Sequence, residues 1–178
     1  MTFHHHLKSE TWPKHQRVDG IIMRQLKSQD FSFLNAFSLW YNYLQDKGFQ
    51  TDIDFGAIRP DFSLQKAIVT LPKVEDKVIT SYENHQDISD ENQFLGVYYV
   101  IRGSAHGSRY VLPTLEHDSP ARPYFEYMAA LPDEGWKHFV DFINALHEDS
   151  HNTVISSAKD AFETLDSFLK SQIIKIES

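Results

Sequence analysis

Apolar residues recur every three or four positions along most of the chain, which is the spacing of one face of a helix. The pattern is clearest in the last third, where it predicts one helix over 136–146 and a long amphipathic helix over 154–169. Ser150 and Asn152 are residue types that cap helix starts, so either is expected to begin the second of these helices.

The first two thirds of the chain follow the same period. A helix is predicted over 33–44, with its end near Gly48, and another is predicted to start near Asp90 and to carry its apolar face to Ile101. Weaker patterns predict helices at 61–71 and 73–86, and loops are expected at 49–60 and 112–123. Because glycine and proline are few and no Asn-Gly or Asp-Gly hairpin signal occurs, we expect an all-α helical bundle that forms a single domain over residues 1–178.

Composition narrows the possible functions. The 178 residues include no cysteine, which excludes disulfides and Cys-ligated zinc or iron–sulfur sites. Lys and Arg number 17 against 25 Asp and Glu, a formal charge of −8, so a generally basic nucleic-acid binder is disfavoured. The apolar runs are too short to span a membrane and the N-terminus lacks the pattern of a secretory signal. We therefore expect a cytoplasmic protein, with a monomer as the default.

Glycines gather on the helix that is predicted to start near Asp90. Gly103 and Gly107 stand four residues apart and share one helix face, although glycine inside a helix costs about 1 kcal/mol relative to alanine. Two explanations are open at this point: close packing of another helix on the small residues, or a ligand that lies against bare backbone. His106, between the two glycines, is expected to point away from their face.

The N-terminal segment carries a second candidate. Its helix is expected either to start near Pro13 or to start near Leu7 and bend at Pro13. In the second case Lys8, Thr11, Trp12 and His15 share one face. A neutral imidazole on such a face can bind a metal, although a lone helical histidine is more commonly a surface or boundary residue.

No histidine pair stands at a usual zinc spacing. His147 and His151 are four residues apart, but Asp149 and Ser150 between them are expected to break the helix. A zinc enzyme is therefore not expected.

Three segments together resemble the heme oxygenase family, particularly its short bacterial members. The first is Leu7-x-x-x-Thr11-x-x-x-His15-x-x-Val18-Asp19, which is similar to the family's first helix. The second is Tyr98-Tyr-Val-Ile-Arg-Gly103-Ser104-x-x-Gly107, which is similar to its glycine-rich distal helix, kinked at the glycines. The third is Ala158-Lys-x-Ala161-Phe162 with the apolar residues that follow, which is similar to its last helix.

The resemblance implies a role for each matching residue. His15 is expected to ligate heme iron, and Gly103 and Gly107 are expected to let the distal backbone approach iron-bound dioxygen. Ser104 stands where animal members carry an aspartate that orders the catalytic water, so Ser104 and the backbone carbonyls of the glycine turn are the candidates for that task. Lys8 and Tyr98 match positions that contact the heme propionates, and Trp12 occupies a further position that is basic in the family.

The resemblance also implies the reaction. Heme is both cofactor and substrate, and its ring is opened to biliverdin with release of carbon monoxide and ferrous iron, using O2 and electrons from a ferredoxin, a flavodoxin or a reductase. The basic N-terminal face, with Lys14 and Arg17, is the expected docking surface for such an acidic donor.

Departures from the family keep alternatives open. Trp136 and Val140 stand where many members place propionate-binding Lys or Arg, so heme would be anchored differently, by Lys14, Arg17, Arg102 or Lys137, or only weakly. One alternative is a heme- or tetrapyrrole-binding protein without ring-opening activity. Another is an all-α relative that binds no heme, such as an interaction module; a thiaminase-like hydrolase in its usual form would need a cysteine nucleophile, which the chain lacks.

Overall fold

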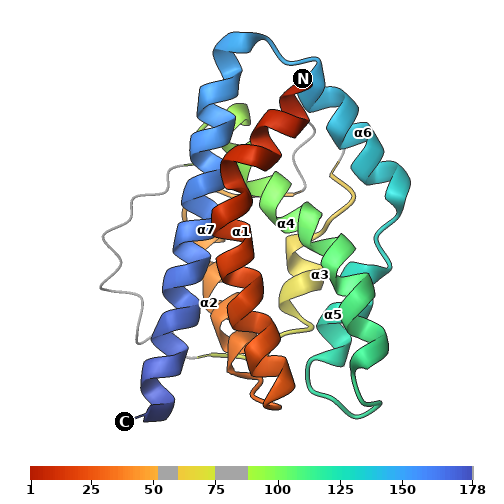
Figure 1. Ribbon diagram of the computed structural model, residues 1–178, viewed down its shortest axis with the longest axis vertical. Helices are drawn as coiled ribbons and strands as arrows, with labels where there is room; N and C mark the ends of the chain where they lie inside the picture. The colour runs from red at the N-terminus through yellow and green to blue at the C-terminus, as the bar shows by residue number, and fades with distance from the viewer. Residues whose placement is uncertain (52–59, 75–87, 178) are drawn as a thin grey trace.

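The computed structural model is an all-α bundle (Figure 1). It describes residues 1–51, 60–74 and 88–177. The helices are α1 (Phe3–Lys27), α2 (Ser32–Asp46), α3 (Leu64–Ile68), α4 (Glu91–Val111), the short 3-10 helix η2 (Leu112–Thr114), α5 (Arg122–Ala129), α6 (Asp133–Asn144) and α7 (Glu148–Glu177). The long helix α7 packs against α1, α2 and α4, so it forms the spine of the bundle.

Helix α1 starts earlier than either alternative drawn from the sequence. It begins at Phe3, and the Thr2 side chain caps it by accepting a hydrogen bond from the His5 amide at 3.4 Å. Pro13 lies inside the helix, where it removes one backbone donor. Packing along α7 compensates for that loss, because Phe3, Leu7, Val18 and Ile21 are all buried.

The predicted end of α2 near Gly48 is confirmed. Gly48 adopts a φ of 99°, the left-handed conformation that glycine takes at helix ends. The next amide, of Phe49, then donates to the carbonyl of Leu44 at 2.9 Å and closes the last turn.

Helix α4 begins where its sequence indicates and runs without interruption through the glycine cluster. Asp90 and Gln93 form a capping box, in which each side chain accepts from the other residue's backbone amide. The first half of α4 lies directly on α7: a Cβ added to Gly96 would come within 2.5 Å of the Val154 carbonyl oxygen. Here glycine is required by close helix packing.

Two expectations about the start of α7 are wrong. Helix α7 begins at Glu148, so neither Ser150 nor Asn152 caps it. The break in helical conformation lies at 145–147, just before α7, whereas Asp149 and Ser150 are helical. Glu148 and Asp149 instead place two negative charges in the first turn, where the helix dipole favours them. The expected loop at 112–123 is largely irregular, but the structure forms α5 just beyond it, anchored by buried Tyr124, Phe125 and Met128.

The weaker predictions have mixed outcomes. The expected helix at 61–71 shortens to Leu64–Ile68, started by the Ser63 side chain. Most of the helix expected at 73–86, and most of the loop expected at 49–60, lie outside the described residues. In the part of the chain that is described, none of the helices combines the length and apolar character needed to cross a membrane.

Candidate functional site

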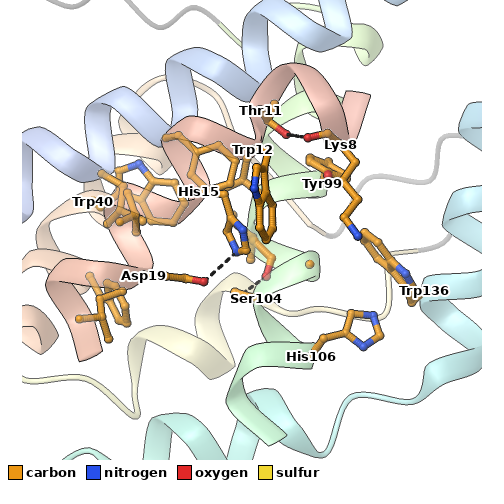
Figure 2. Close-up of a pocket in the computed structure, with 18 of the residues that line it drawn as sticks. Lys8, Thr11, Trp12, His15, Asp19, Trp40, Tyr99, Ser104, His106 and Trp136 are labelled. Atoms are coloured by element: carbon orange, nitrogen blue, oxygen red, sulfur yellow. Dashed lines mark hydrogen bonds and ion pairs between the residues drawn. The ribbon is translucent and has the colours of Figure 1, made fainter. Parts of the chain in front are cut away.

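A cavity of about 350 Å³ lies between α1 and α4 (Figure 2). Helix α1 supplies one wall and the glycine-containing part of α4 supplies the facing wall, while α2, α5, α6 and α7 close the ends and floor. The lining is mainly aromatic and aliphatic, with a few polar groups, which is the usual make-up of a small-molecule site. The residues from α1 are His4, Lys8, Thr11, Trp12, His15, Val18, Asp19 and Ile22, and those from α4 are Tyr99, Val100, Ile101, Gly103, Ser104 and His106.

His15 projects from α1 into this cavity. One ring nitrogen, Nε2, lies 3.2 Å from Oδ2 of Asp19, one helical turn further on. The ring is also held between Trp12 and Phe162, with ring centroids at 5.3 and 5.7 Å. Burial raises the pKa of the Asp19 carboxyl, and the nearby His15 opposes that rise. A histidine whose one nitrogen is oriented by a carboxylate, and whose other nitrogen has no partner among the described residues, is arranged as metal-binding histidines are.

The facing wall of α4 has no side chain at its centre. A Cβ added to Gly103 would meet nothing closer than the Trp136 ring, at 3.7 Å, and a Cβ added to Gly107 would meet nothing within 4 Å. Close helix packing, one of the two explanations left open by the sequence, therefore does not account for either glycine. Of the two, Gly103 lines the cavity and Gly107 is not among its lining residues.

Ser104 reaches the same cavity beside two buried phenols. Its hydroxyl donates to the Ile101 carbonyl at 2.6 Å, and its proximity lowers the pKa of Tyr124, which burial nonetheless raises to about 12. The hydroxyls of Tyr124 and Tyr41 are 2.7 Å apart, and both residues line the cavity. Burial likewise raises the pKa of Tyr41, so both phenols stay protonated at neutral pH. The floor therefore offers hydroxyl groups and no charge.

Lys8 and Trp12 both line the cavity, but Tyr98 is not among its lining residues. The Tyr98 hydroxyl instead donates to Asp61 Oδ1 at 2.8 Å. The fully buried guanidinium of Arg102 binds the same carboxylate at 2.8 and 2.9 Å. Tyr99, the next residue along α4, occupies the cavity wall instead. The sequence pattern does not distinguish these two adjacent tyrosines, which lie about 100° apart around α4 and have different neighbours.

Most of the basic residues proposed from the sequence are engaged elsewhere. Lys14 pairs with Glu163 of α7, and Arg17 Nε lies 3.5 Å from Asp166. Arg102 is held by Asp61, and Lys137 is exposed and outside the cavity lining. The cationic N-terminal face is therefore largely an ion-paired contact between α1 and α7.

Two histidines that sequence reasoning left without a role stand at one end of the cavity. The His4 and His106 rings both meet the Trp136 ring edge-on, with centroids 5.8 and 5.3 Å away. Burial lowers the pKa of both imidazoles. The long sequence separation hid this cluster, because only the folded chain brings α1, α4 and α6 together there.

A metal held only by protein side chains is not supported in the described residues, which contain no group of three histidines or carboxylates able to bind an ion.

Comparison of the chain with protein-family models, with curated proteins and with solved structures found no match. The site geometry is therefore the basis for assigning a function.

Proposed function

We propose that this protein is a heme oxygenase, which binds heme in the cavity between α1 and α4 and opens its ring to biliverdin. One observation carries the proposal. His15, oriented by Asp19, stands on one wall of an aromatic cavity, and the other wall includes the bare backbone of Gly103. A flat ligand whose metal accepts one more nitrogen fits between two such walls.

The lining supports the fit of a large, mostly apolar ring. The volume of about 350 Å³ lies at the lower end of the range for ligand sites, roughly 300–1,000 Å³, and the cavity is partly open to solvent. Trp12, Trp40, Tyr99 and Trp136 supply flat aromatic surface around it. Such surfaces stabilise a planar macrocycle by burial and by offset stacking.

Each of the cavity residues would have a distinct role towards the bound heme. His15 would hold the heme iron, and Asp19 would fix the orientation of the imidazole and raise its basicity. Gly103 would leave space on the opposite face, because any side chain there would point into the cavity. Ser104, Tyr41 and Tyr124 supply neutral hydroxyls that can hold a water molecule beside that face.

When bound, heme supplies the redox centre at which dioxygen is reduced and the porphyrin itself is oxidised, with electrons from an external donor. The protein contributes orientation of the macrocycle and a partly dry site for that reaction. A ferredoxin, a flavodoxin or a reductase is the donor class implied. Because Lys14 and Arg17 are paired with α7, reversing their charges would disturb the α1–α7 contact as well as any docking. Salt dependence of the electron-transfer rate in the unmodified protein is the cleaner test of docking.

A hemin titration of the purified protein, followed by absorption in the Soret region, tests the proposal. We expect saturable one-to-one binding with the spectrum of a histidine-ligated heme, lost in His15→Ala. His138→Ala is the matched control, since the His138 side chain is 71% exposed on α6 and outside the cavity lining. Ascorbate or a ferredoxin system added to the complex is then expected to bleach the Soret band and produce biliverdin.

A tetrapyrrole-binding protein without ring-opening activity is the second candidate. The observation in its favour is that the Ser104 hydroxyl already donates to the Ile101 carbonyl at 2.6 Å, which leaves only its acceptor capacity for a water molecule. A complex that forms through His15 but stays intact under reductant and oxygen would establish this candidate instead. If no complex forms, both heme-based functions are excluded.

A further inference from the structure

The cavity has two unlike ends. At one end His15 and the carboxylate of Asp19 stand together. At the other end the rings of His4 and His106 contact the Trp136 ring. The Lys8 side chain extends towards the same ring in Figure 2. No carboxylate lines this second end, since Asp19 is the one acidic residue among the described residues of the lining.

We infer that His4 and His106, with Lys8, bind the carboxylate groups of the ligand at the Trp136 end of the cavity. This inference rests on the proposed function and adds the direction in which an acidic tetrapyrrole would enter. It assigns the anion-binding role to two histidines in place of the arginines and lysines expected from the sequence, which are engaged in ion pairs or lie outside the cavity lining.

His106 provides the strongest support. Its Nε2 is buried and has no hydrogen-bond partner in the described structure, although buried ring nitrogens are normally paired. The ring meets the Trp136 ring edge-on, with centroids 5.3 Å apart, and His106 lines the cavity. Because this nitrogen has no accessible surface with the ring as it stands, the ring must rotate towards the cavity for Nε2–H to donate to a carboxylate oxygen of the ligand.

His4 and Lys8 complete the group from one turn of α1. The backbone amide of His4 donates to Asn144 Oδ1 at 2.8 Å, which ties this turn to the end of α6. Its ring meets both Tyr99 and Trp136 edge-on. The Lys8 ammonium lies 5.9 Å from the Trp12 ring centroid and extends towards Trp136 in Figure 2, without a carboxylate partner among the described residues.

The charges around both imidazoles favour an incoming anion. His5 and Lys8 act on His4, and both lower its pKa. Arg109 and Arg102 lower the pKa of His106, whereas Asp133 raises it. Each arginine is already paired, with Asp133 and Asp61 respectively, which leaves Lys8 as the cation of the lining that has no carboxylate partner among the described residues. A ligand carboxylate would favour the protonated imidazoles, so its binding should strengthen as the pH falls.

Hemin and its dimethyl ester separate this inference from the proposed function, because the ester keeps the iron and the ring but lacks the carboxylates. We expect the unmodified protein to bind hemin more tightly than the ester, with a preference that grows between about pH 8 and pH 6, across the ordinary histidine pKa of about 6.5. In the double variant His4→Gln/His106→Gln the preference should fall roughly tenfold or more, as for lost hydrogen bonds to a charged group. The exposed His138→Gln variant should keep it.

Three results would count against the inference or its basis. Equal affinity of the unmodified protein for hemin and the ester would overturn the inference and leave the proposed function standing. So would a double variant that keeps both the preference and its pH dependence while circular dichroism shows an intact helix content. A protein that binds neither compound would overturn the proposed function itself. The pH profile of the unmodified protein requires no variant, so the inference remains testable if the double variant does not fold.

Discussion

Helix α4 contains two halves that use glycine for opposite purposes. In the first half, Gly96 lies against α7, where an added Cβ would come within 2.5 Å of Val154 oxygen and 2.7 Å of the Ala158 nitrogen. In the second half, Gly103 and Gly107 face no backbone at all, and the nearest atom to an added Cβ at Gly103 is a Trp136 ring carbon at 3.7 Å. The same residue type thus permits close helix packing at one place and leaves space at the other.

The contrast shows what a glycine in a helix can indicate. Each such glycine weakens the helix by about 1 kcal/mol relative to alanine, so its presence needs a compensating reason. At Gly96 the protein itself supplies that reason. At Gly103 and Gly107 no contact in the described structure supplies one. At Gly103, which lines the cavity, a ligand against the wall would. The predictions below test whether the two halves differ in this way.

The largest loss of stability is expected when the ion pair of Arg102 is broken, at the point where the two halves of α4 meet. Arg102 is fully buried there, and Asp61 binds it at 2.8 and 2.9 Å while also accepting from Tyr98. Asp61→Ala would leave a buried guanidinium without a counter-charge, which typically costs about 3–5 kcal/mol. Urea unfolding should show this loss, and hemin binding should weaken because Arg102 directly precedes Gly103.

Asp141→Ala serves as the control for this prediction, since Asp141 is an exposed acid on α6. An Asp61 variant as stable as that control would mean that the ion pair does not hold the cavity half of α4 in place.

The next largest loss of stability is expected from a substitution at Gly96, in the half of α4 that packs on α7. Gly96→Ala forces α4 away from α7, because the atoms in the way belong largely to backbone. Overpacking of this kind costs about 1–3 kcal/mol, occasionally more. The free energy of unfolding should fall accordingly, as measured with urea. An unchanged value would show that α4 and α7 can separate freely, and would remove the contrast between the halves.

The sequence pattern predicts most of the helices, but not the short helix α5 or the start of α7. The three-to-four-residue periodicity predicts α2, α4, α6 and α7, because each of these helices carries apolar residues at that spacing. Helix α5 was missed because its eight residues carry few periodic positions and follow a proline-rich stretch. The sequence pattern places the start of α7 too late, because the polar residues of its first turn resemble a loop. Glu148 and Asp149 are stabilised there by the helix dipole, which the apolar pattern does not register.

The site was predictable where it depends on one helix face and hidden where it depends on packing. Lys8, Trp12 and His15 were identified from the spacing on α1, and all three line the cavity. Tyr98 was selected over Tyr99, although only the packing of Asp61 on α4 decides which tyrosine is buried away from the cavity. His4 and His106 acquire a shared position only through Trp136, more than a hundred residues from His4 in sequence.

In the cavity half, the substitution that damages α4 at Gly96 should have the opposite effect on stability. Gly103→Ala introduces a Cβ at ordinary contact distance from Trp136, so the ligand-free protein should be unchanged or more stable by up to about 1 kcal/mol. Hemin affinity should nevertheless fall, because the methyl group enters the cavity. Thermal unfolding with and without hemin measures both.

Gly107→Ala is the matched control for Gly103→Ala. It should bring a similar gain in stability with a smaller loss of affinity, since Gly107 is not among the lining residues. If Gly103→Ala binds hemin as tightly as the unmodified protein, the bare wall is not where the ligand lies.

The smallest expected effect is on how stability depends on pH, and it comes from the histidines at the Trp136 end. Burial lowers the pKa of His4 and His106 in the fold, while unfolded histidines titrate near 6.5. As the pH falls below about 6.5, the unfolded chain therefore binds protons first, and the ligand-free protein should lose stability. His4→Gln/His106→Gln should flatten this part of the profile, and His138→Gln should leave it unchanged. The raised pKa of Asp19 acts with the opposite sign, so the profile is best measured above about pH 5, beyond the usual range of carboxyl titration.

If hemin carboxylates lie between the two imidazoles, their charge favours the protonated rings, and the stability of the complex should instead rise as the pH falls over the same interval. A hemin complex that follows the ligand-free profile would place those carboxylates elsewhere.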